Sequence, residues 1–358
     1  KKYVKKHEYR FNHIFSLEST NLEIYNCLLK NKIHNLNSTQ ILFTVYGETG
    51  AGKTHTLLKD RGIILILLED LIKNKYSIRG SAYEIYNNSV YDLINDKTRK
   101  NIRENMNGKI EVINLEKIKI NNFHNVHDFL GRIKKNRIVG LSTKNNQSSR
   151  SHAIVDLEVI DKFSKIPRIF HIKFIDLAGN ERGEVSTKYN KTRLIEGCEI
   201  NNSLLAFKEC IRAMYHNKSH IPFRRSCLTK ILRDYFLYKS NIIIIGNISP
   251  AKSSTQATLN TLNYISMLLK VNYRKVKRLN NINTKFKNKN INKHKKRSLK
   301  QITKKTTKTI EDELMQNKKF KQNIKFKPIK NSHIQKFNNL NKKPVHLDTM
   351  DFRKSALV

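Results

Sequence analysis

The chain has 358 residues and a formal net charge of +41, from 70 Lys and Arg against 29 Asp and Glu. Its length allows one large domain with an appendage, or two ordinary domains. The charge disfavours an enzyme of neutral small metabolites and indicates an acidic polymer, a membrane surface or an acidic protein as partner. The apolar runs are too short to span a membrane, and no charged-then-apolar signal segment opens the chain.

Alternating β-rich runs and amphipathic stretches fill the first 270 residues. In chain order they predict a strand at 40–46, a helix at 61–73, a strand at 81–86, a helix at 126–135, strands at 154–160 and 169–175, helices at 201–215 and 226–237, and a strand at 242–248. This order predicts an α/β fold with a central sheet flanked by helices.

Composition changes near residue 271. Residues 271–358 carry 26 Lys and Arg against 5 Asp and Glu, are rich in Asn, and lack apolar periodicity. Such a segment buries too little apolar surface to offset the entropy of ordering it. We therefore predict one folded domain over residues 1–270 and a basic, mostly disordered tail over residues 271–358.

The four cysteines are Cys27, Cys198, Cys210 and Cys227, far apart and without a Cys-x-x-Cys pair. This spacing indicates reduced thiols in a cytosolic protein and argues against a disulfide framework or a zinc site.

A phosphate-binding loop follows the first predicted strand. It reads Gly47-Glu48-Thr49-Gly50-Ala51-Gly52-Lys53-Thr54, which is G-x-x-x-x-G-K-T between a strand and a helix. Glycines let the backbone N–H groups turn toward phosphate oxygens. Lys53 is predicted to reach the β- and γ-phosphates, and Thr54 to hold Mg²⁺.

Two further segments have the chemistry of such a site. The predicted strand at 169–175 ends at Asp176, which can bind the Mg²⁺ shell through water or simply cap a helix, and the Gly179 N–H can sense the γ-phosphate. Residues 145–152 surround Arg150 with hydroxyls that can position a water molecule and complete a Mg²⁺ shell.

These three segments, in this order, resemble the kinesin motor domain. Residues 47–54 match its P-loop, residues 145–152 its switch I and residues 176–181 its switch II. The resemblance continues through segments 84–87, 203–206, 222–224 and 261–264, and covers about residues 8–270. It implies the P-loop NTPase-like kinesin fold, ATP and Mg²⁺ as ligands, and microtubule-stimulated ATP hydrolysis.

Within that family the chain is most similar to kinesin-13, the internal motors that depolymerise microtubules. Segments 179–183, 193–201, 208–213 and 220–224 carry this similarity, and the triplet Lys208-Glu209-Cys210 is the most class-specific of them. As a bare helical triplet it would be a solvated face with one buried cysteine.

The resemblance assigns roles to individual residues. Ser148 would orient the attacking water, Ser149 would join Thr54 and Asp176 at Mg²⁺, and Arg150 would bridge to Glu181 to close the switches. His55 would lie near the adenine. Microtubule contacts are expected from Lys208, Glu209, Cys210, Arg212, Arg224, Arg225, Lys230 and Arg233. The basic tail is either composition drift or a salt-sensitive tether to the acidic tails of tubulin.

The sequence departs from the family in several places. Residues 1–358 contain no counterpart of the first strand, with its basic-x-basic-Pro element, or of the Lys-Val-Asp loop of kinesin-13. The chain starts with Lys, so we expect it to be a piece of a longer product. Cys227 stands where the family usually has Lys, the loop at 57–61 is short, and residues 263–270 lack the neck pattern of a walking motor.

The leading hypothesis is an ATP-hydrolysing, kinesin-13-like motor that depolymerises microtubule ends in the cytoplasmic cytoskeleton, including the mitotic spindle. The alternatives are a degenerate, non-catalytic microtubule binder, a plus-end-directed kinesin, and a P-loop protein that binds nucleic acid. No nucleic-acid module or membrane segment is visible, so neither partner is expected. The sequence leaves the oligomeric state open.

Overall fold

The computed structural model describes residues 6–34, 40–138, 150–161, 168–180, 191–238 and 240–271, without the side chains of residues 34, 138 and 191–198. The chain divides into two compact units, Lys1–Lys287 and Asn288–Val358, and every described residue belongs to the first. Apart from Val271, the predicted tail lies outside the described residues.

A sheet of eight strands forms the centre of the described part. Its order is β10-β1-β9-β8-β2-β3-β4, with β7 beside β2. The strands are β1 (Gln40–Gly47), β2 (Ser77–Tyr86), β3 (Ser89–Asp92), β4 (Arg99–Lys100), β7 (Ile118–Ile120), β8 (His152–Asp161), β9 (Arg168–Asp176) and β10 (Asn241–Asn247). A second, small sheet pairs β5 (Ile102–Glu104) with β6 (Ile110–Val112). The five predicted strands are therefore confirmed, within a few residues at their ends.

The strand directions decide where the motifs meet. β1 runs parallel to both β9 and β10, and β8 runs antiparallel to β9. In this register Asp176 at the end of β9 lies opposite Val45 of β1 and Ala153 of β8. Three segments therefore meet at the carboxyl ends of β1 and β9, where loops of parallel strands come together. They are the P-loop, the turn after β9 and the segment before β8.

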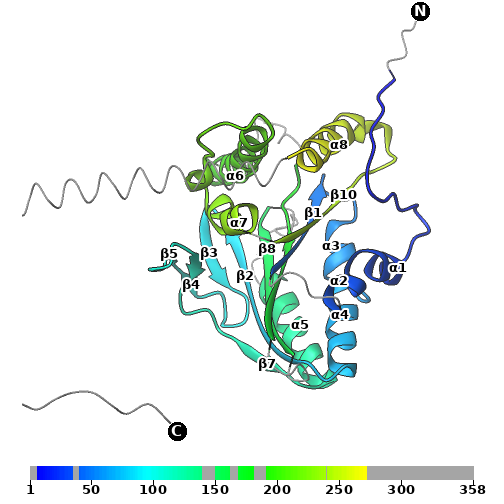
Figure 1. Cartoon of the computed structure of the whole chain (residues 1–358). Coiled ribbons are helices and arrows are strands. Elements are labelled where there is room, and N and C mark those ends of the chain that lie inside the picture. The colour runs from blue at the N-terminus through cyan, green and yellow to red at the C-terminus, as the bar shows by residue number, and fades with distance from the viewer. Residues whose placement is uncertain are drawn as a thin grey trace, which may run out of the picture. The chain divides into compact units, whose positions relative to one another are not determined.

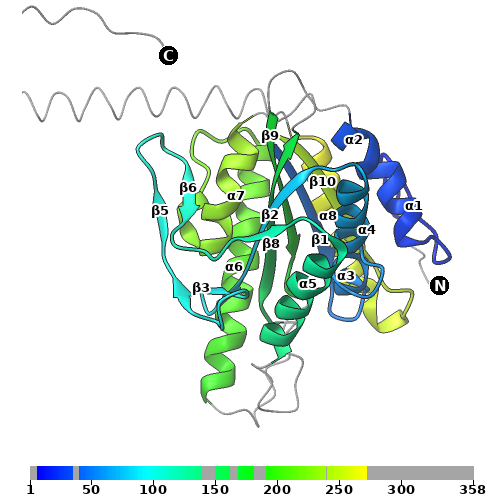
Figure 2. The same ribbon diagram turned by 90° about the horizontal axis from the view of Figure 1, so that it is seen from below.

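Helices cover both faces of the sheet (Figures 1 and 2). One face carries α1 (Asn21–Tyr25), α2 (Asn31–His34), α3 (Lys53–Leu57), α4 (Ile63–Lys73) and α5 (Phe123–Ile138). The other carries α6 (Lys191–Tyr215), α7 (Cys227–Leu237) and α8 (Thr255–Leu269). No helix in the ranges that the structure describes is long and apolar enough to cross a membrane.

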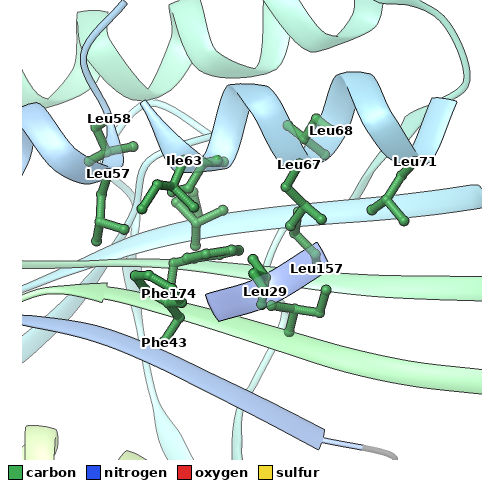
Figure 3. Close-up of a cluster of buried hydrophobic side chains, with 14 of the residues drawn as sticks. Leu29, Phe43, Leu57, Leu58, Ile63, Leu67, Leu68, Leu71, Leu157 and Phe174 are labelled. Atoms are coloured by element: carbon green, nitrogen blue, oxygen red, sulfur yellow. The ribbon is translucent and has the colours of Figure 1, made fainter. Parts of the chain in front are cut away.

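Each face of the sheet has its own apolar core, which explains why β1 is apolar at nearly every position. Phe43 of β1 and Phe174 of β9 point toward α4, where they pack with Ile63 and Leu67 (Figure 3). Leu42 and its neighbours on the opposite face pack against α6, α7 and α8. The central strands are thus buried on both sides.

The four predicted helices are confirmed, whereas α1, α2 and α8 were not predicted. Ser226 caps α7 rather than joining it, because its side chain and that of Thr229 accept hydrogen bonds from each other's backbone N–H groups. α6 begins at Lys191, about ten residues before its predicted start. The sequence did not indicate this extension, because residues 191–200 lack a clear apolar period. α8 was not predicted as a helix: only residues 261–264 were recognised, as a family motif.

Strand β10 forms an edge of the sheet. Among the described residues it pairs only with β1. A groove of about 1570 Å³ runs along β10 and α8, and Phe11 and Phe15 of the N-terminal segment line its other side. Within the described part of the chain, β10 thus has one unpaired edge beside an apolar groove.

Candidate functional site

The P-loop turns sharply between β1 and α3. Gly50 and Gly52 adopt φ angles of +83° and +90°, in the left-handed region that side chains disfavour. Gly47 is required for a different reason: a Cβ atom there would lie 2.1 Å from the backbone oxygen of Asn247. These glycines form an open cradle of backbone, with nothing within 4 Å of a Cβ built at Gly50.

Lys53 points into the curve of this loop. Its ammonium group donates hydrogen bonds to the carbonyl oxygens of Gly47, at 3.0 Å, and Glu48, at 2.7 Å. The side chain is buried, so its charge lies inside the loop rather than in solvent. A cation held there by carbonyl groups is positioned to bind a phosphate.

Thr54 and Asp176 meet beside the loop. The Thr54 hydroxyl donates to Oδ2 of Asp176 at 2.8 Å, and Arg137 donates to the same oxygen from Nη1 at 3.1 Å. The other carboxylate oxygen, Oδ1 of Asp176, is buried and has no hydrogen-bond partner among the described residues, and the same holds for Oε1 of Glu48. Hydroxyl and carboxylate oxygens are the ligands that Mg²⁺ prefers, so this group fits the predicted metal site.

The turn after β9, residues 176–180, contacts the P-loop and α8. Asn180 donates its backbone N–H to the carbonyl of Gly47 at 3.2 Å, and its side-chain amide to Thr261 of α8 at 2.9 Å. Gly179 immediately precedes this contact and is buried. The contact of Gly179 with a γ-phosphate stays a prediction.

The segment before β8 is described only from Arg150 onward. Arg150 is half-buried, and the Ser151 hydroxyl donates to Glu84 at 3.2 Å. Lys97 forms an ion pair with Glu84 at 3.0 Å. Ser148, Ser149 and Glu181 lie outside the described residues, so the bridge between Arg150 and Glu181 stays a prediction.

His55 follows the P-loop on α3. Its side chain is exposed and lines the groove along β10 together with Ala51 and Gly52. The predicted place of the adenine therefore opens into this groove. The role of His55 itself remains a prediction.

The residues predicted to contact microtubules gather on α6, α7 and the turn before α7. Arg212, Arg224 and Arg225 are exposed, and Lys208, Glu209 and Lys230 are half-buried. Arg225 is ion-paired with Glu209, and Lys208 lies 5.1 Å from the centre of the Tyr264 ring. These side chains make one mixed, mostly basic surface, named the α6–α7 surface below.

Two predicted contacts need correction. Cys210 is 1% exposed and packs in the core between α6 and the sheet, because it falls on the buried stripe of the helix. Arg233 is 14% exposed and binds Glu104 of β5 and the neighbouring Asp234. Arg233 therefore holds the small sheet against α7 and is not a free surface cation.

Arg137 and His152 were not predicted as residues of the site. Arg137 lies beyond the end of the predicted helix at 126–135, and nothing in the sequence distinguishes it from its basic neighbours. His152 belongs to a recognised motif but received no role. Burial of the imidazole, together with the charges of Lys53 and Arg137, lowers the pKa of His152 to about 3.

Comparisons with known proteins agree with this geometry. The family model of the kinesin motor domain matches residues 1–271. Kinesin-like protein KIN-13B of Arabidopsis thaliana is 38% identical over 274 residues, which are 73% of this chain and 40% of that protein. Kinesin-like protein KIF24 of Homo sapiens is 33% identical over 274 residues, or 73% of this chain and 20% of that protein.

A solved structure of a fast kinesin superposes with a TM-score of 0.66 at 26% identity, covering 74% of this chain and 81% of that one. This chain spans less than half the length of the curated relatives it matches. The P-loop, the 176–180 turn and a sheet covered by helices on both faces agree with these matches. The chain belongs to the kinesin motor-domain family, whose members are microtubule-stimulated ATPases.

Proposed function

We propose that this protein binds ATP with Mg²⁺ at the P-loop and hydrolyses it when its motor domain engages a microtubule. The observation that carries this proposal is the convergence of Lys53, Thr54 and Asp176. These residues place one cation, one hydroxyl and one carboxylate with an unpartnered oxygen around an open glycine loop. A degenerate P-loop would not need all three groups.

Different residues of the site would bind the phosphates, hold Mg²⁺ and orient the attacking water. Lys53 and the loop N–H groups would bind the phosphates, and the Gly179 N–H would lie against the terminal one. Thr54 and Asp176 would hold Mg²⁺, with Ser149 as a further ligand. Mg²⁺ bound there would neutralise phosphate charge during transfer to water. Ser148 would orient that water, and the bridge between Arg150 and Glu181 would exclude bulk solvent.

Microtubule binding is proposed for the α6–α7 surface. The exposed Arg212, Arg224 and Arg225 present positive charge, which suits an acidic protein surface. We place the motor domain at residues 1–270 and assign the basic residues 271–358 as a diffuse tether to the same acidic partner. The proposed location is the cytoplasmic microtubule cytoskeleton, with the mitotic spindle as its site in dividing cells.

We further propose a kinesin-13-type action, in which ATP turnover drives depolymerisation of microtubule ends. The support is the class-specific triplet Lys208-Glu209-Cys210 together with relatives named KIN-13 in two plants. The burial of Cys210 is compatible with this assignment, because the two residues before it remain at the surface.

The decisive experiment measures phosphate release by the full-length protein with and without microtubules. Stimulation that Lys53→Ala abolishes supports the proposed ATPase. Microtubule binding without any turnover would instead support the non-catalytic alternative. In a second assay, stabilised microtubules are imaged with ATP: shrinkage from the ends supports the depolymerase, and gliding supports the plus-end-directed alternative.

A further inference from the structure

His152, the first residue of β8, joins two parts of the molecule through its ring. Its Nδ1 atom accepts a hydrogen bond from the backbone N–H of Ala178 at 3.0 Å. Its Nε2 atom lies 2.8 Å from the hydroxyl oxygen of Ser203 on α6. The ring is 2% exposed, so both contacts are shielded from water.

The partners of the ring determine its tautomer. A backbone N–H can only donate, so Nδ1 of His152 carries no proton and the single ring proton lies on Nε2. Nε2 therefore donates to the Ser203 oxygen. The Ser203 hydroxyl in turn donates to the carbonyl of Ile200 at 2.8 Å. Every polar hydrogen along this path has an acceptor.

One end of this hydrogen-bonded path lies at the proposed nucleotide site, and the other lies on the helix of the proposed microtubule-binding surface. Ala178 lies in the 176–180 turn, two residues after the Asp176 carboxylate and two before Asn180, which contacts the P-loop. Ser203 lies on α6, about 7.5 Å along the helix axis from Lys208 at a rise of about 1.5 Å per residue. Through one buried ring, the phosphate side of the domain is thus joined to the helix of the α6–α7 surface.

We propose that His152 is a positioning residue that couples the 176–180 turn to helix α6 through its two ring nitrogens. A movement of the Ala178 amide must either carry the imidazole and Ser203 with it or leave a buried donor without an acceptor. Because the second outcome is costly, the turn and the helix move together. This inference rests on the proposed microtubule-stimulated ATPase.

Ser203→Ala is the first test variant, because it removes the acceptor on α6 and leaves the P-loop, the 176–180 turn and the ring in place. Ser81→Ala is the matched control. Ser81 is 5% exposed and Ser203 is 6% exposed, and Ser81 lies on β2, outside the path. The control therefore reports the cost of losing a buried serine hydroxyl alone.

Two histidine variants separate the arms of the path. His152→Asn places its amide oxygen as many bonds from Cβ as Nδ1, so it can still accept from Ala178 but does not reach Ser203. His152→Gln extends its amide to the position of Nε2 and can still donate to Ser203, but loses Ala178. If both hydrogen bonds of the ring are needed, each variant loses the coupling. The double variant with His152→Asn and Ser203→Ala should then lower stimulated turnover no more than either single variant does.

The readouts are basal ATP turnover, microtubule-stimulated kcat and the half-saturating microtubule concentration. For Ser203→Ala we expect basal turnover and half-saturation to stay within about twofold of the parent and the stimulated kcat to fall about tenfold, a size comparable to the roughly 5- to 150-fold changes in affinity between coupled sites. For Ser81→Ala all three values should match the parent. A merely structural role would lower basal and stimulated turnover together.

A second readout needs no microtubules. Amide hydrogen exchange of α6 is compared between the protein with ADP and with a non-hydrolysable ATP analogue. The parent should change its α6 exchange between the two nucleotides, and Ser203→Ala should not. The proposal is overturned if the parent shows no change, or if Ser203→Ala keeps both this change and full stimulation. A parent that responds here but shows no microtubule stimulation refutes the proposed function and not the coupling.

Discussion

Arg137 of α5 donates a hydrogen bond to the carboxylate of Asp176 at the end of β9, and both side chains are more than nine-tenths buried. The pair joins two elements 39 residues apart in sequence. It supplies the charge that keeps the Asp176 carboxylate inside the domain, next to the hydroxyl of Thr54.

Arg137→Ala should therefore destabilise the protein by about 3 kcal/mol, because it leaves a buried carboxylate without its cation. Mg²⁺ should offset part of this loss by restoring positive charge beside Asp176. The check is urea unfolding of parent and variant with and without Mg²⁺, with Arg137→Lys as the charge-conserving control. Equal Mg²⁺ effects on parent and variant would argue against a metal site at Asp176.

The glycines of the P-loop should differ in their tolerance to a methyl group. Gly47→Ala places Cβ against the Asn247 carbonyl, so β1 and β10 must separate locally and the melting temperature should fall by many degrees. Gly50→Ala meets open space and costs only its left-handed φ, about 1 kcal/mol. Thermal unfolding of the two variants side by side measures the difference. Similar melting temperatures would show that the β1–β10 contact is looser than described.

Acid should destabilise the fold through His152. Burial, and then Lys53 and Arg137, lower the pKa of His152 to about 3, whereas the unfolded chain has the ordinary value of about 6.5. Between these values only the unfolded state binds the proton, so the stabilisation is complete above pH 6.5 and is lost progressively as the pH falls toward 3. At pH 5.5 the loss is about 1.4 kcal/mol.

Urea titrations at pH 7.5 and 5.5 test this linkage. His152→Asn has no ring to protonate, so its loss of stability over the same interval should be smaller than that of the parent by about 1.4 kcal/mol. Identical losses in parent and variant would mean that other groups account for the acid sensitivity.

The cysteines should react with thiol reagents at very different rates. Burial raises the pKa of Cys210 to about 12, with Glu209 adding to the shift, so its thiol stays protonated at neutral pH. Cys27 is exposed. Brief alkylation followed by peptide mapping should find Cys27 modified and Cys210 unmodified until the protein is denatured. Rapid labelling of Cys210 in the native protein would contradict its burial and reopen its assignment as a surface contact.

Single charges on the α6–α7 surface should have modest, salt-dependent effects. Arg224→Ala should weaken microtubule affinity by about 1 kcal/mol or less, since the residue is exposed and its 3.4 Å pair with Glu104 is easily exchanged. Arg132→Ala is the control, because Arg132 is an exposed arginine on α5, on the other face of the sheet. Cosedimentation at two salt concentrations measures both variants. An equal effect from Arg132→Ala would indicate general charge attraction and not a defined surface.

Local patterns in the sequence were sufficient to predict the central strands, the phosphate-binding loop and the family of this protein. The apolar run at 41–46 followed by the glycine loop predicted β1 and its phosphate site, because a strand, a turn and a helix start are each encoded by neighbouring residues. The order of the three motifs identified the kinesin family, which the comparisons confirm. The start of α6 was not predicted, since residues 191–200 lack a clear apolar stripe. The helix α8 was not predicted either, although Leu259, Leu262, Ile265 and Leu268 follow one another at a helical spacing.

Contacts between distant segments were decided only by the tertiary structure. Arg137 meets Asp176, and His152 meets Ser203 across 51 residues, because the register of β8 on β9 places Ala153 opposite Asp176 and the helices pack above that end of the sheet. The same packing turns Cys210 inward and uses Arg233 to hold the small sheet. A sequence pattern specifies which residues can form a helix or a loop. Which buried charges and ring nitrogens find partners depends on strand register and helix placement, and these are set by the packing of the whole domain.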